Sequence, residues 1–60
     1  MDPKAAMIIR LWQSEVDAIA AYREAYRRTH NPLFLHIAKQ EIHHKEELEK
    51  LLRQLGVRMR

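Results

Sequence analysis

The chain has 60 residues with a formal net charge of +3, and it contains one Gly, two Pro and no Cys. Sixty residues form one small unit at most, and the lack of Cys excludes internal disulfides and thiolate metal sites. The composition is rich in Ala, Leu, Glu, Arg and Lys, which favour helix. Because so short a chain buries little apolar surface, we expect it to need a bound metal, association with other copies, or both.

The basic balance raises the question of nucleic-acid binding. Arg23, Arg27 and Arg28 cluster, but acidic residues are interleaved elsewhere and no turn signal indicates a recognition helix. We interpret these arginines as solvated and expect no nucleic-acid partner. The apolar run at residues 5–12 is brief and contains Arg10, so it is neither a signal peptide nor a membrane span. We therefore expect a soluble, cytoplasmic protein without a membrane partner.

The first half of the chain predicts one long helix, over about residues 3–30. Asp2 is a suitable N-cap, Pro3 suits the first helical position, and nothing interrupts the pattern before His30. Its main seam, at steps of three and four residues, consists of Ile8, Trp12, Glu15, Ile19, Tyr22 and Tyr26. A second apolar flank consists of Met7, Leu11, Ala18, Ala21 and Ala25.

The second half predicts a turn at residues 30–32 and a helix over about residues 32–55. Asn31 and Pro32 repeat the cap-and-proline signal, and Gly56 supplies a left-handed C-cap position. The main seam of this helix consists of Phe34, Ile37, Glu41, His44, Leu48, Leu51 and Leu55. Its second flank consists of Leu35, Ala38, Ile42 and Leu52.

These elements predict an all-α fold in which residues 1–60 form a single antiparallel two-helix hairpin. The short connection makes the two helices neighbours. Two helices cannot cover apolar stripes this wide, whereas a second copy can. We therefore expect a homodimer in which two hairpins form a four-helix bundle.

Three polar residues interrupt the seams: Glu15 on the first helix, and Glu41 and His44 on the second. Burying an unpaired carboxylate costs several kcal/mol, on the order of the stability of a small domain. A dimer would bring four such carboxylates and two imidazoles to one interior, and two divalent ions would balance the charge. Oxygen and nitrogen donors suit iron or manganese, so the pattern predicts a metal site.

The stretch Glu15–Tyr22, the pair Asn31-Pro32 and the Glu41-Ile42-His43-His44 segment together resemble half of a ferritin-like domain, over roughly residues 8–56. The similarity is to rubrerythrin-like proteins and to the short encapsulated ferritins. It implies a di-iron site at a homodimer interface with Glu15, Glu41 and His44 as ligands and as the residues of a ferroxidase centre. It further implies Tyr22 close to the site, an encapsulating shell protein as a partner, and a location inside a protein nanocompartment.

The heights of the three ligands along the hairpin are left open by the sequence. Glu15 lies sixteen residues before Asn31 and Glu41 ten residues after it. At about 1.5 Å per residue these positions differ in height by roughly 9 Å, and His44 reduces the difference to about 4–5 Å. His43, one step off the seam, is interpreted as a flank residue that could hydrogen-bond a ligand.

Three other functions are compatible with the sequence. A peroxidase or a manganese protein would use the same ligands. A structural or interaction hairpin could dimerise with its Glu and His side chains merely paired to each other or to Arg. A basic nucleic-acid-binding dimer is the weakest alternative, and a steep salt dependence of binding would be its mark.

Overall fold

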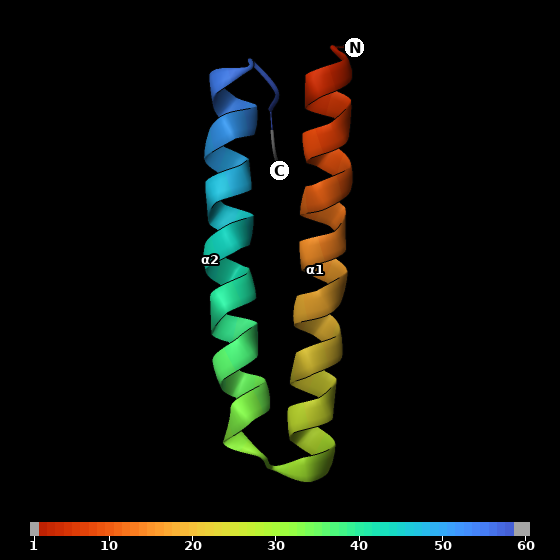
Figure 1. Ribbon diagram of the computed structural model, residues 1–60, viewed down its shortest axis with the longest axis vertical. Helices are drawn as coiled ribbons and strands as arrows, with labels where there is room; N and C mark the ends of the chain where they lie inside the picture. Colours follow the sequence, from red (N-terminus) through yellow and green to blue (C-terminus); the bar gives the residue numbers. More distant parts are fainter. Residues whose placement is uncertain (1, 59–60) are drawn as a thin grey trace.

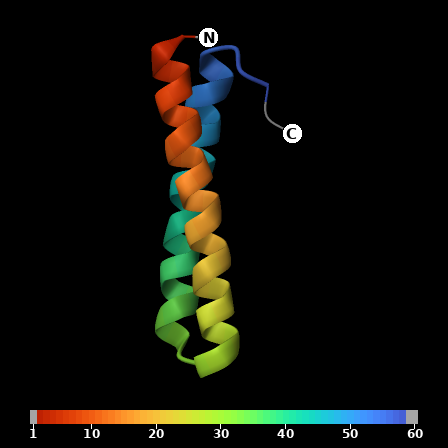
Figure 2. The same cartoon turned by 90° about the vertical axis from the view of Figure 1, so that its right-hand side faces the viewer.

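The structure, a computed structural model, describes residues 2–58. These residues form two helices, α1 (Pro3–Thr29) and α2 (Pro32–Gln54), and no strand. The helices run antiparallel and side by side (Figure 1), as a rod of 41 × 17 × 14 Å whose helices cross at a shallow angle (Figure 2). The predicted all-α hairpin is confirmed, and each helix ends one residue before its predicted end. Neither α1 nor α2 combines the length and apolarity that crossing a bilayer requires.

Both helices begin at the predicted caps. The Asp2 carboxylate accepts a hydrogen bond from the backbone N–H of Lys4 at 2.9 Å. The Asn31 side chain accepts one from the backbone N–H of Leu33 at 3.0 Å. Each bond satisfies one of the N–H groups that a helix start leaves without a partner, while the proline at the first position has no N–H to satisfy.

The turn depends on a residue whose conformation the sequence did not reveal. His30 caps α1 in the left-handed region, with φ of 56°, and its N–H donates to the Tyr26 carbonyl at 2.7 Å. Its ring lies edge-on to the Tyr26 ring at 5.9 Å. Asn and Gly are the usual residues at such a cap, which is why His30 gave no signal. Gly56, by contrast, has the predicted positive φ of 81° after α2.

The buried line between the helices differs from the predicted seam of α2. Ala38 and Leu52, predicted on the flank, are 2% and 0% exposed, whereas Leu51 and Leu55, predicted on the seam, are 45% and 43% exposed. On α1 the seam residue Ile19 is buried, with 7% of its surface exposed. The predicted seam of α2 is therefore only partly covered within a single hairpin. The reason is that an apolar stripe wider than one helix contact leaves one edge uncovered.

A polar contact links the helices in the half of the hairpin away from the turn. The indole N–H of Trp12 donates to Glu49 Oε2 at 3.0 Å, and the Lys45 ammonium donates to the same oxygen at 3.3 Å. The indole hydrogen bond, followed by the Lys45 contact, holds the pKa of Glu49 below its ordinary value. Because both donors favour the charged carboxylate, this contact stabilises the hairpin above the ordinary pKa of Glu.

We predict that Glu49→Gln lowers the free energy of unfolding by about 1 kcal/mol at pH 7, since an amide accepts the two bonds less strongly than a carboxylate. Because the pKa of Glu49 is lower in the folded protein than its ordinary value of 4.5, the charged carboxylate stabilises the fold at pH values above 4.5. This stabilisation is lost as the pH falls through the folded-state pKa. The difference in the free energy of unfolding between wild type and variant, measured by urea unfolding, should therefore become smaller below pH 4.5. The exposed Glu46→Gln is the matched control, and an equal loss in that variant would contradict the assignment.

Candidate metal centre

The structure brings Glu15, Glu41 and His44 together. Glu15 comes from the middle of α1, and the other two stand one turn apart on α2, so one helix face presents both toward Glu15. One donor atom from each lies within 4.8 Å of the others. His44 Nδ1 is 4.0 Å from Glu15 Oε2 and 3.9 Å from Glu41 Oε1. The length of the side chains closes the difference in height that the sequence left open.

The Glu15 and Glu41 carboxylates lie close to each other and are only partly exposed. Their side chains are each 23% exposed, and Glu15 Oε2 is buried without a hydrogen-bond partner. The adjacent Glu41 carboxyl is the main cause that raises the pKa of Glu15, since two neighbouring carboxyl groups favour a shared proton. Burial and the charge of Glu41 raise it further, while His44 opposes them. The cluster therefore disfavours its fully charged state and would be relieved by a cation.

The spacing of the donors suits a shared metal ion. Distances of 3.9 and 4.0 Å are too long for hydrogen bonds. Donors at about 2 Å from one ion lie up to about 4 Å apart, so a small inward shift of the widest pair would complete the set. Two carboxylates and one imidazole are donors that iron and manganese accept. The orphaned Glu15 Oε2 is the atom that such an ion would satisfy.

The cluster lies in the middle of an open apolar face of the hairpin. From a cluster member, successive steps of three and four residues continue along the same side of the helix. We call this surface the cluster face; apart from the three cluster residues it consists of Met7, Leu11, Ala18, Ile37, Leu48, Leu51 and Leu55. Met7 and Leu11 are 64% and 51% exposed, and His44 itself is 57% exposed. The cluster is thus bordered by α1 and α2 and is open to solvent on the cluster face.

The two remaining predicted site residues make their contacts elsewhere. The Tyr22 ring stacks on Phe34, with centroids 6.4 Å apart, and within residues 2–58 its hydroxyl has no hydrogen bond to a cluster carboxylate. His43 pairs with Glu47, Nε2 to Oε1 at 3.1 Å, on the exposed side of α2. His43 lies about 100° around the helix from His44, which agrees with its interpretation as a flank residue.

Sequence reasoning missed the polar support beside the cluster. Lys45 directly follows His44 and is held by Glu49, four residues on. That spacing is the usual signal for an ion pair along a helix, but only the fold shows that Trp12 of α1 binds the same carboxylate. The contact lies one helical turn from Glu15 and fixes how α1 and α2 meet next to the cluster.

Comparison of the chain with protein-family models, with curated proteins and with solved structures gives no match. The functional assignment therefore depends on the geometry of the cluster and on the residues of this chain.

We predict that Glu41→Ala leaves the metal-free protein folded, with a melting temperature equal to or above that of the wild type. The substitution removes the carboxylate that raises the pKa of Glu15, and replacing a half-buried charge by an apolar group is often neutral or stabilising. Thermal melting in a chelating buffer measures this, with the exposed Glu47→Ala as the control. Unfolding of Glu41→Ala in that buffer would instead make Glu41 a structural partner.

Proposed function

We propose that this chain is a ferritin-like di-iron carboxylate protein that binds two iron ions at a homodimer interface and acts as a ferroxidase. The observation that carries the proposal is the convergence of Glu15, Glu41 and His44 on an open apolar face. Isolated Glu and His side chains are common on helix surfaces. A buried carboxylate oxygen without a hydrogen-bond partner is not, since such an atom costs about 1–3 kcal/mol.

The dimer is supported by the position of the predicted α2 seam. In a four-helix bundle each helix points diagonally inward, between its two neighbours. The seam through Glu41, His44, Leu48, Leu51 and Leu55 lies to one side of the contact with α1, as a diagonal core position would. A second copy placed on the cluster face would cover the exposed leucines and bring two clusters together. The same wide stripe that left Leu51 exposed in the hairpin would then be the bundle core.

Charge supports two ions per dimer. Two copies supply four carboxylates and two imidazoles, and two divalent ions neutralise the four negative charges. Glu15, Glu41 and His44 of both copies would hold these ions. The donor set does not separate iron from manganese, so a manganese form and a peroxidase remain variants of the same proposal.

In the proposed reaction iron is the substrate. Two Fe(II) ions each give up one electron, and O₂ accepts both together with two protons, leaving two Fe(III) and hydrogen peroxide. The part of this chain is to bind and position: Glu15, Glu41 and His44 hold the ions, and the leucines of the cluster face exclude bulk water. The encapsulating shell protein implied by the ferritin-like resemblance is a further proposed partner.

A structural role is the alternative with an observation of its own. His44 Nδ1 lies almost equally far from both carboxylates, so an imidazolium could offset one of their two negative charges without any metal. In that case the chain would be a dimerising interaction module. Metal analysis of the purified protein separates the two roles, because an imidazolium pair neither needs nor retains an ion.

We predict that the wild type binds about one Fe(II) or Mn(II) per chain and melts at a higher temperature with metal than with chelator, because metal binding to the native state stabilises it by linkage. Glu41→Ala should lose this binding and the metal-dependent shift in melting. His43→Ala should keep both, since His43 pairs with Glu47 outside the cluster. Metal content by mass spectrometry and melting by calorimetry give two readouts.

Retention of two irons per dimer in Glu41→Ala, with Fe(II) oxidised at the wild-type rate, would show the site assignment to be wrong. Equal melting of the wild type in metal and in chelator, with no metal retained, would favour the structural role. Oxygen consumption during Fe(II) addition tests the ferroxidase step separately from binding.

We predict that the wild type sediments as a dimer or a larger oligomer at micromolar concentration. Leu51→Lys should weaken that association by about tenfold or more, because it places a charge in a packed apolar interface. The neighbouring Lys50→Glu changes charge about 100° around the helix and is the matched control. A compact, folded wild-type monomer at the same concentration would rule out the dimer.

A further inference from the structure

A hollow lies on the face of the hairpin opposite the cluster. It has a volume of about 380 Å³ and is lined by Val16, Ile19, Ala20, Arg23, Ile42 and Lys45. Three of these residues directly follow a cluster residue in the chain: Val16 follows Glu15, Ile42 follows Glu41, and Lys45 follows His44. Successive helical residues point about 100° apart, so the hollow opens away from the cluster face. A second copy on the cluster face would leave it uncovered.

The hollow continues along the boundary between the helices. A neighbouring hollow of about 510 Å³ shares Ala20 and Arg23 with it and adds Tyr26, Arg27 and Leu35. We call the two together the cationic furrow. From Val16 to Arg27 it extends eleven residues along α1, about 16 Å at the rise of a helix. That length exceeds a small ligand and matches about three turns of a second helix.

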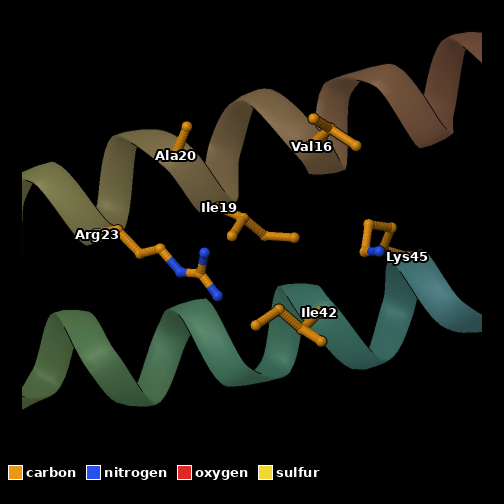
Figure 3. Close-up of a pocket in the computed structure, with 6 residues that line it drawn as sticks. All are labelled: Val16, Ile19, Ala20, Arg23, Ile42 and Lys45. Carbon is orange, nitrogen blue, oxygen red and sulfur yellow. The ribbon is translucent and has the colours of Figure 1, made fainter.

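Cations stand at intervals along an apolar floor. Figure 3 shows the Arg23 side chain running from α1 toward α2 and the Lys45 side chain entering from α2 at the other end, with Ile19 and Ile42 between them. Within residues 2–58 Arg23 has no carboxylate within ion-pair distance. Lys45 shares Glu49 with Trp12, and Arg27 pairs with Glu24. The uncompensated charge is therefore at Arg23, in the centre of the furrow.

We propose that the cationic furrow binds an acidic amphipathic helix of a partner protein. The apolar floor would take the apolar stripe of that helix. Lys45 lines the furrow beside Val16, and Arg23 lies seven residues further along α1, so acidic residues seven apart on the partner would meet both cations. Seven residues are two helical turns, which places both acids on the same side of the stripe.

The floor is what favours a helix over other anionic partners. Nucleic acids and anionic lipid headgroups present phosphates to cations, and neither fills a groove between two isoleucines. The planar Arg23 guanidinium can bind a carboxylate through two parallel hydrogen bonds, and its aliphatic stem packs on apolar side chains. The furrow thus combines apolar contact with two charges at a fixed spacing, which gives specificity for a charge pattern.

The test uses a fluorescein-labelled helical peptide of about 18 residues, with a leucine stripe and two glutamates seven apart beside the stripe. Its isomer carries the same residues with the two glutamates moved to the opposite face. Fluorescence anisotropy with the full chain should show binding of the first peptide about tenfold or more tighter than of the isomer. Arg23→Glu should weaken binding by a similar factor. Arg10→Glu, an equal charge change on an exposed residue outside the furrow, should alter it less than about twofold.

A charge exchange supplies the second measurement. A peptide with a lysine in place of the glutamate that would face Arg23 should bind the Arg23→Glu variant more tightly than it binds the wild type. Equal binding of the isomer and the designed peptide, or equal weakening by Arg10→Glu and Arg23→Glu, would mean that the basic surface attracts acids without a furrow, and would overturn the proposal. So would the absence of peptide binding. The metal centre takes no part in this experiment, so its outcome is independent of the proposed function.

Discussion

The alignment of α1 with α2 along the hairpin is the constraint on which the rest of the structure depends. A connection of two residues between Thr29 and Pro32 leaves the helices almost no freedom to slide. The left-handed His30 and the Asn31 cap fix where α2 begins, and the Trp12 bond to Glu49 holds the other half of the contact. With both ends set, Glu15 can only meet the turn of α2 that carries Glu41 and His44. The cluster follows from the alignment, since its members attract each other weakly or repel.

The two faces of the hairpin differ in what they leave unsatisfied. The cluster face carries unpaired negative charge and uncovered apolar surface: two carboxylates, one of them with an oxygen that lacks a hydrogen-bond partner, and exposed leucines. On the opposite face the surplus is positive, centred on Arg23. A chain of this size buries little of either surplus, so each is open to solvent or to a partner. The proposed metal and second copy answer the first, and a partner helix answers the second.

Much of the hairpin could be predicted from the sequence because its signals are local. The two cap-and-proline pairs and Gly56 mark helix ends within a few residues of chain, and Glu41 and His44 stand out on an apolar seam. The contact line could not be predicted, because periodicity gives the width of an apolar stripe and not the part of it that another helix covers. That is why Ala38 and Leu52 are buried instead of Leu51 and Leu55. The role of Lys45 was likewise hidden, since it depends on a tryptophan 33 positions away in the chain.

Because each cluster residue is directly followed by a furrow residue, both sites depend on the number of residues in α2. Each of Glu15, Glu41 and His44 is followed by a residue of the furrow, so substitutions on one face can leave the other unchanged. A single inserted residue early in α2 acts differently, because it turns everything after it by about 100°. Glu41 and His44 would then take the places of Ile42 and Lys45, next to Arg23. One insertion would therefore remove Glu41 and His44 from the cluster and place the Glu41 carboxylate in the furrow. Homologous chains should therefore vary freely in exposed residues of α2 while keeping the number of residues between Pro32 and His44 constant.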